Sequence, residues 1–426
     1  MTQRMLFDLP PTFTNRSTRA VTFQGKLDLP IHRWYRLTPS FSPALAYDIA
    51  SEFGLDETDF VLDPFSGVGT VPLCMKYRGV PSCSVEINPY LHFVGTVKTR
   101  TYSDLEAVED VFHAFVATAK NELKKLPNDG QAVAWLAEHQ ALVPTLHNIH
   151  RWWTGPNLMQ LVCLRKLLLS DATEPTFRDL LKLGLLSILI PVSNARHNHV
   201  SLTFAEKPLG TVDVGAILQE KYAAMLEDLR AVSTLPCADA VVYSGNSKAL
   251  TAVLPKSTEV SAIITSPPYP NRFSYARETR PHLIFFEFVQ EAEAVGQQET
   301  EAIGGTWGKA TSVLAGGIEP ETEIVASSLK PYLAGIDNNG GLMAHYVTKY
   351  FNDIYTHAST VANVCRRHSR LAYVIGNSKF YGHPLPSDEI LAAIFGHFGF
   401  TLNRIDKMRK RQSKAGLYEA VVFMSR

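Results

Sequence analysis

The sequence contains few cysteines, and they form no recognisable structural pattern. Its 426 residues include five, Cys74, Cys83, Cys163, Cys237 and Cys365. No two of them have the spacing of a zinc-binding finger, and an odd number offers no disulfide framework. We therefore expect reduced cysteines in a protein of the cytoplasm.

Long apolar runs are also missing. The most apolar stretch, from Leu180 to Val192, is shorter than a membrane span and contains Lys182, so it predicts a buried helix. The N-terminal stretch "MTQRMLFDLPPTF" lacks the continuous apolar core of a signal peptide. Neither a membrane partner nor export is expected.

Net charge is absent as well. Lysine plus arginine and aspartate plus glutamate number 41 each. Many nucleic-acid-binding proteins are basic overall, so this balance is mild support for other classes of protein. It leaves room for a local basic face, because binding depends on where the charges lie rather than on their sum.

What the sequence does contain is an alternation of strands and helices. The stretch "FVLDPFSGVGTVPLCMKYRGVPSCSVEINP" predicts a strand, a glycine-rich turn, a helix and a second strand. Strand patterns return in "DAVVYSGNS", "VSAIITSPPY" and "LAYVIGN", and then in "FTLNRIDKMRK" and "YEAVVFMSR". The alternation indicates the α/β class, with an open, mostly parallel, Rossmann-like sheet whose last two strands form an antiparallel edge.

A block of helical patterns interrupts this alternation. Ser103 and Glu106 form a capping box ahead of apolar residues at helical spacing. Further helical patterns follow at 131–141, 156–170 and 176–192. We therefore divide the chain into three parts, 1–100, a mainly helical insertion at 101–235, and 236–426. Residues 293–345 are rich in glycine and threonine and predict a long loop.

The glycine-rich turn has the features of a cofactor site. Glycines at a strand-to-helix turn let the backbone approach a ligand, and the helix N-terminus attracts an anionic group. Glu86 ends the next strand, at about the distance that suits binding of ribose hydroxyls. The dinucleotide pattern GxGxxG is not completed, because no glycine follows Gly69 at the required spacing. Together these features predict a cofactor that contains a nucleoside.

A second strand ends in Ser266, Pro267, Pro268 and Tyr269. Its position predicts that Ser266 lies at the carboxyl edge of the sheet, where ligands bind in open α/β folds. The prolines lock the turn and leave carbonyl groups as acceptors, and Tyr269 adds a flat apolar face. We expect a slot for a planar group with an exocyclic amine. Hydrogen bonds to the amine would free its lone pair and stabilise the transition state.

The pair "DPFSGVGT" and "TSPPY" resembles the amino-methylating DNA methyltransferases that use S-adenosylmethionine, and Ser-Pro-Pro-Tyr resembles their cytosine-N4 branch. The resemblance covers most of 40–100 and 236–290, and 342–426 more loosely. It implies a cofactor-binding half before the insertion and a catalytic half after it. Many Ser-Pro-Pro-Tyr enzymes carry the two motifs in the opposite order, which circular permutation tolerates.

The resemblance also implies roles for single residues. The catalytic residues would be Ser266, Pro267, Pro268 and Tyr269. The cofactor would be held by Asp63, Pro64, Phe65, Ser66, Gly67, Gly69, Thr70 and Glu86. Asn246, in "YSGNSKAL", stands where the family usually has an aspartate that contacts adenine, and "LTPSFSPALAYDIA" resembles the helix that precedes the glycine turn and helps to bind the cofactor.

Positive charge for a DNA partner occurs in three clusters. They contain Arg196 and His197 in "NARHNHVS", then Arg272, Arg277 and Arg280, and finally Lys407, Arg409 and Arg411. We expect these clusters to form one groove for double-stranded DNA, with the insertion as the candidate target-recognition region. The histidines His147, His150, His197 and His199 have no cysteine or acid at ligand spacing, so no metal is expected.

The implied function is site-specific transfer of a methyl group to the exocyclic N4 of a flipped-out cytosine by direct displacement. A bacterial or archaeal restriction–modification system is the expected setting. The restriction enzyme would sit on a separate chain, because the length leaves little room for a nuclease domain.

Four other functions come into consideration. Adenine-N6 methylation of DNA is the nearest, and an RNA-modifying enzyme of the same fold is another. A module that binds the cofactor and DNA without catalysis would have no need of an intact Ser266–Tyr269 motif. Carbon-5 cytosine methylation uses a Pro-Cys pair as nucleophile, and Pro236-Cys237 lacks the glutamine that follows it in such enzymes.

Overall fold

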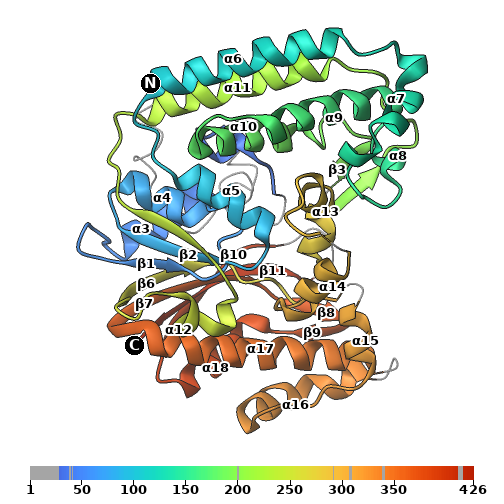
Figure 1. The fold of residues 1–426 in the computed structure, drawn as a ribbon. Helices are drawn as coiled ribbons and strands as arrows, with labels where there is room; N and C mark the ends of the chain where they lie inside the picture. The colour runs from blue at the N-terminus through green and yellow to red at the C-terminus, as the bar shows by residue number, and fades with distance from the viewer. Residues whose placement is uncertain are drawn as a thin grey trace.

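The computed structural model describes residues 28–37, 40, 42–198, 201–290, 292–306, 309–337, 341–410 and 416–426. Its centre is a seven-stranded sheet with the strand order β10-β11-β7-β6-β1-β2-β5 (Figure 1). The strands are β1 (Val61–Asp63), β2 (Ser82–Glu86), β5 (Ala240–Ser244), β6 (Val260–Thr265), β7 (Cys365–Gly376), β10 (Thr401–Lys410) and β11 (Tyr418–Ser425).

The strand directions confirm the predicted sheet. The neighbouring pairs from β7 to β5 are all parallel, and β11 is antiparallel to both β7 and β10. Every residue of β1, β2 and β6 is buried, as expected for parallel strands covered on both faces. The antiparallel edge is therefore present, with β11 inserted between β7 and the outermost strand β10.

Helices cover both faces of this sheet (Figure 1). Ile264 packs in a core with α3 (Pro43–Glu52) and α4 (Thr70–Arg78), whereas Ile263 packs in a core with helices of the opposite face. Successive residues of a strand point to opposite faces, which explains this division. The opposite face is covered by α12 (Leu250–Val253), α17 (Leu342–Val364) and α18 (Ser387–His397).

The predicted insertion is mainly helical. It contains α6 (Leu105–Lys124), α7 (Ala132–Glu138), α8 (Ile149–Trp152), α9 (Gly155–Ser170), α10 (Pro175–Ile188) and α11 (Val214–Val232). Figure 1 shows α6 and α11 side by side at the top, above α5 (Pro89–Thr99). A hairpin of β3 (Ala195–Asn198) and β4 (Ser201–Phe204) follows α10. These helices share one apolar core with α5, which carries Leu91 and Val94 into it.

The expected capping box is wrong by one residue. The N-cap of α6 is Asp104, whose Oδ1 accepts a hydrogen bond from the backbone N–H of Ala107 at 2.9 Å. Aspartate is a strong N-cap residue, so its side chain takes the place predicted for that of Ser103.

The long loop expected at 293–345 is also wrong. This region forms α14 (Ala292–Glu301), α15 (Lys309–Ala315) and α16 (Glu323–Asp337), and α17 begins at Leu342. Leu314, Val325, Leu329 and Ile336 are buried in the core around α17. Burial of these side chains outweighs the low helix propensity of glycine and threonine.

Three further elements lie within the catalytic half. They are α13 (Tyr275–Phe285), which follows the Ser-Pro-Pro-Tyr turn, and the short hairpin β8 (Ser378–Phe380) and β9 (His383–Leu385). Across the residues that the structure describes, no helix combines the length and apolar character needed to cross a membrane.

Candidate functional site

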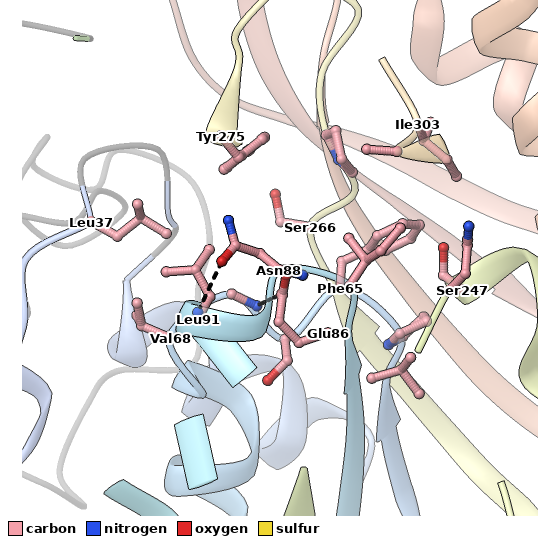
Figure 2. A pocket seen from close by; sticks show the side chains of 18 of the residues that line it. Leu37, Phe65, Val68, Glu86, Asn88, Leu91, Ser247, Ser266, Tyr275 and Ile303 are labelled. Carbon is pink, nitrogen blue, oxygen red and sulfur yellow. Dashed lines mark hydrogen bonds between the residues drawn. The ribbon is translucent and has the colours of Figure 1, made fainter. Parts of the chain in front are cut away.

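A cavity lies at the carboxyl ends of the central strands. Both predicted motifs line it, although they are far apart in the sequence. The predicted residues that it gathers are Asp63, Pro64, Phe65, Ser66, Gly67, Thr70, Glu86, Asn246, Ser266 and Pro268. Figure 2 shows Phe65, Glu86 and Ser266 around this space. Gly69, Pro267 and Tyr269 do not line it.

Asp63 and Ser66 shape the glycine-rich turn from within. Oδ1 of Asp63 accepts hydrogen bonds from the backbone N–H of Phe65 at 3.0 Å and from the hydroxyl of Thr265 at 2.5 Å. The Ser66 hydroxyl donates to Oγ of Ser84 at 2.9 Å. Both side chains are buried, so these bonds fix the turn against the ends of the neighbouring strands.

Gly69 has a packing role at the start of α4. It is the N-cap with φ of 74°, in the left-handed region that favours glycine. A Cβ atom at this position would lie 3.1 Å from Cα of Gly95 on α5. Gly69 therefore permits close contact between the two helices and lies behind the cavity wall.

Glu86 is held by the backbone of both adjoining turns. Its Oε2 accepts from the N–H of Gly67 at 2.7 Å, and its Oε1 accepts from the N–H of Asn88 at 2.8 Å. Burial raises the pKa of the Glu86 carboxyl to about 7, against the opposing effect of these two N–H groups. Each carboxylate oxygen can accept more than one hydrogen bond. The side chain can therefore also accept from ligand hydroxyls.

The Ser-Pro-Pro-Tyr turn is anchored by the helix and strands beside it. The Ser266 hydroxyl donates to the carbonyl of Val374 on β7 at 3.0 Å. The hydroxyl of Tyr350 on α17 donates to the carbonyl of Pro268 at 2.8 Å. One turn earlier on α17, the Tyr346 hydroxyl accepts from the N–H of Arg272 at 3.1 Å.

This anchoring bears on two expectations about the turn. The proline carbonyls were expected to serve as acceptors, and the Pro268 carbonyl accepts a hydrogen bond from the hydroxyl of Tyr350 on α17. Tyr269 is half-buried against the core that contains α17. Its ring therefore does not form a wall of the cavity in this conformation.

Several residues of the cavity were not predicted. Asn88 caps α5 by accepting from the N–H of Tyr90 at 3.0 Å, and its amide donates to Thr279 Oγ1 at 2.8 Å. The pair Asn88-Pro89 is an N-cap pattern that the sequence offered. Tyr275, Gln298 and Ile303 come from α13 and from α14 and the residues after it, and no pattern distinguished them.

The predicted cofactor segments contribute in part. Leu37 and Ser40, from "LTPSFSPALAYDIA", line the cavity, whereas the helix α3 that this segment begins does not. Asn246 lines it too, and its Oδ1 accepts from the N–H of Lys248 at 3.0 Å. The Asn246 side chain therefore begins the short helical turn at Ser247–Ala249.

Of the three predicted DNA-binding clusters, the one on α13 lines a groove, whereas Arg196 and Lys407 are not among the residues that line it. Arg277 and Arg280 on α13 line a second groove together with α8 and β4 of the insertion. Arg196 on β3 is exposed on the same hairpin, and Arg272 is exposed just before α13. Lys407 is exposed on the outermost strand, 4.5 Å from the ring of Tyr418. Arg411 and the side chains of His197 and Arg409 lie outside the described residues.

The part of the chain that the structure describes contains no group of three or more histidine, cysteine, aspartate or glutamate side chains arranged to hold a metal. Trp153, one of two adjacent tryptophans, is fully buried and donates to the Leu189 carbonyl at 2.9 Å. Its neighbour Trp152 is half-buried and lines the second groove.

Comparison with known proteins identifies relatives along nearly the whole chain. The Type II methyltransferase M.BsoBI of Geobacillus stearothermophilus is 22% identical over 93% of this chain and 84% of its own. The Type II methyltransferases M.AvaI of Nostoc sp. (strain PCC 7120 / SAG 25.82 / UTEX 2576) and of Anabaena variabilis are each 22% identical over 91% of this chain and 83% of theirs.

No protein-family model matches the sequence. Among solved structures, an rRNA methyltransferase from Streptomyces viridochromogenes aligns with 97% of this chain and 95% of its own, at a TM-score of 0.32 and 9% identity. A structural similarity this weak supports no conclusion about this chain. Over nine-tenths of its length, the chain is therefore similar in sequence to type II methyltransferases.

Proposed function

We propose that this chain is a site-specific DNA methyltransferase that transfers a methyl group from S-adenosylmethionine to the exocyclic N4 of cytosine. The observation that carries the proposal is the shared cavity of Glu86 and Ser266, which brings the cofactor motif and the catalytic motif to one edge of the sheet. The type II methyltransferase relatives support a role in DNA modification within a restriction–modification system. A restriction enzyme on another chain would be the partner.

The residues of the cavity fit the proposed cofactor. Glu86 offers two carboxylate oxygens, each with one backbone donor and spare capacity, to the ribose hydroxyls. The turn at Ser66 and Gly67 would hold the methionine part, and Leu37, Phe65 and Val68 provide apolar walls. When bound, the cofactor supplies an electrophilic methyl group on a sulfonium sulfur.

Ser266 would orient the amine that receives the methyl group. Its hydroxyl hydrogen is used on the Val374 carbonyl, so its oxygen remains able to accept a hydrogen bond from an amine N–H. The Pro268 carbonyl has a second lone pair beside the one that Tyr350 occupies. Two such acceptors would hold the amine hydrogens and leave the nitrogen lone pair facing the methyl group, a stabilisation that acts in the transition state.

The base has to leave the duplex to reach this edge of the sheet. Arg272, Arg277 and Arg280, just beyond the catalytic turn, are proposed to contact DNA together with Arg196 and His197 of the insertion. Lys407, Arg409 and Arg411 remain candidates for contact with a more distant part of the duplex, because β10 is three strands away from β6.

Nucleoside analysis tests the proposal. DNA from cells that express the chain is digested to nucleosides, and the methylated nucleosides are identified by mass spectrometry. DNA from cells that express Glu86→Ala is the control. We expect N4-methylcytosine in the first sample and its loss in the second. Detection of N6-methyladenine alone would favour adenine-N6 methylation instead. If no methylated base exceeds the background of untransformed cells, the proposed enzymatic function is contradicted.

A further inference from the structure

A second groove lies between the insertion and α13. It is distinct from the cofactor cavity, and α8, β4 and α13 form its walls. The residues that line it are His147, Asn148, Arg151, Trp152, Leu202, Phe204, Arg277, Glu278 and Arg280. Three arginines and two aromatic rings give it the composition of a surface for nucleic acid.

One helix connects this groove to the cavity. Tyr275 and Ala276, at the start of α13, line the cofactor cavity, whereas Arg277 and Glu278 line the groove. Successive residues of an α-helix rise by about 1.5 Å and turn by about 100°, so the two sites are separated by less than one helical turn. A duplex in the groove would therefore lie beside the cavity that receives the flipped base.

The Arg151 side chain is positioned where it can bind an anionic partner. Its guanidinium lies over the ring of Phe204, 4.1 Å from the centroid, and the residue is exposed. Stacking on a ring reduces the conformational freedom of the side chain while its N–H groups stay available at the edge. Arg277 is exposed on the facing helix. The two side chains present positive charge from opposite walls.

Glu278 is the acidic residue in this basic groove, and one of its oxygens is unsatisfied. Oε2 accepts a hydrogen bond from the N–H of Leu202 at 3.1 Å, which fastens the β3–β4 hairpin to α13. Oε1 has no hydrogen-bond partner among the described residues, although the residue is only 7% exposed. A buried acceptor without a donor is costly, and a ligand that provides one would remove that cost.

We propose that this groove recognises the DNA target, with Glu278 Oε1 accepting a hydrogen bond from a base amino group in the major groove and Arg151 and Arg277 contacting the flanking phosphates. Cytosine is the expected base, because its N4 amino group is the donor that pairs with a glutamate in major-groove recognition. This inference rests on the proposed function, since it names the surface by which that enzyme selects its DNA.

The decisive variant is Glu278→Gln. A glutamine keeps the shape of the side chain and one oxygen for the Leu202 N–H, but it puts an N–H₂ donor where Oε1 was. The proposal predicts that kcat/KM at the wild-type target falls roughly tenfold to a hundredfold. Cofactor affinity and melting temperature are expected to stay unchanged. The matched control is Glu220→Gln, which removes the same charge from an exposed position on α11.

The assay uses a plasmid library of random sequence, and methylated positions are mapped by sequencing for each variant. Unchanged target sites and rate in Glu278→Gln would overturn the inference while the proposed function stands. Absence of methylation by the wild-type chain in the same assay would instead contradict the proposed function. A lower melting temperature for Glu278→Gln than for Glu220→Gln would also overturn the inference, because Glu278 would then serve only to fasten the hairpin.

The arginines are tested by the salt dependence of DNA binding. Arg151→Ala and Arg277→Ala are each expected to reduce the slope of log affinity against log salt concentration by about 0.9, the value for one phosphate contact. Arg230→Ala is the control, because Arg230 is paired with Glu109 on the outer helices α6 and α11. Slopes equal to that of the control would contradict phosphate contact in this groove.

Discussion

The hydroxyl of Thr265 donates a 2.5 Å hydrogen bond to Oδ1 of Asp63, across 202 residues of sequence. Thr265 ends β6 and Asp63 ends β1, and these strands are parallel neighbours in the sheet. Pro64 and Ser266 are the next residues in each chain segment. The bond therefore fixes the glycine-rich turn and the Ser-Pro-Pro-Tyr turn relative to each other, and the two motifs form one site.

We predict that Thr265→Val lowers both stability and activity. Valine has nearly the same shape, but it leaves the buried Asp63 carboxyl without one of its donors, which costs about 1–3 kcal/mol. Urea unfolding measures the loss, and Thr265→Ser, which restores a hydroxyl, is the control. Equal free energies of unfolding for the valine and serine variants would refute the structural role of this bond.

Cofactor affinity is predicted to depend on the charge of Glu86. Its pKa is raised to about 7 by burial, and ribose hydroxyls donate better to the carboxylate than to the neutral acid. The dissociation constant for S-adenosylmethionine should therefore rise about tenfold for each pH unit below 7 and level off above it. Calorimetry between pH 5.5 and 8.5 gives this curve.

Glu86→Gln is the control for that titration. It should bind the cofactor more weakly than the wild type at pH 8 and show no slope between pH 5.5 and 8.5. A flat curve for the wild-type protein would mean that Glu86 does not contact the cofactor as a carboxylate.

The same pKa predicts how stability without cofactor varies with pH. The folded protein holds the Glu86 proton up to about pH 7, whereas an unfolded glutamate loses it near 4.5. This stabilising contribution is therefore present below pH 4.5 and is lost as the pH rises to about 7. Relative to Glu86→Gln, the wild type should lose stability between pH 5 and 7, and a gain over that range would contradict the raised pKa.

Tyr350→Phe is predicted to slow methyl transfer with little effect on cofactor affinity. The variant removes the donor to the Pro268 carbonyl and keeps the buried ring. A loss of about 1 kcal/mol in the transition state corresponds to roughly a fivefold lower kcat. Tyr355→Phe on the same helix is the matched control, because its hydroxyl lies 3.5 Å from Nε2 of His397 and not at the Ser-Pro-Pro-Tyr turn. Equal rates for the two variants would show that this anchor has no part in catalysis.

The parts of the site that could be predicted are those that local sequence determines. The strand before Asp63, the turn through Gly67 and the strand before Ser266 follow from β-forming residues that end at glycine or proline. Glu86 was predicted from its distance along the chain. All of these lie on the parallel strands, whose carboxyl ends meet at one edge by the rules of the fold.

The remaining parts depend on contacts between distant segments. The bond from Tyr350 to Pro268 spans 82 residues, and the bond from Glu278 to Leu202 spans 76. Nothing near Pro268 in the sequence indicates that a helix will supply a donor to its carbonyl. The helix α14 was not predicted, because the glycine and threonine residues near it favour a loop. It is stabilised by the burial of Val295 in tertiary contacts.

The most direct test of the central claim compares the wild type with Ser266→Ala in transfer of a labelled methyl group from S-adenosylmethionine to DNA, with product nucleosides identified by mass spectrometry. Ser261→Ala, which loses a side-chain hydrogen bond at the other end of β6, is the matched control. We predict N4-methylcytosine as the wild-type product, and unchanged cofactor affinity with a rate roughly five- to 150-fold lower in Ser266→Ala alone. Labelled N6-methyladenine in place of N4-methylcytosine, or an undiminished rate in Ser266→Ala, would contradict the account.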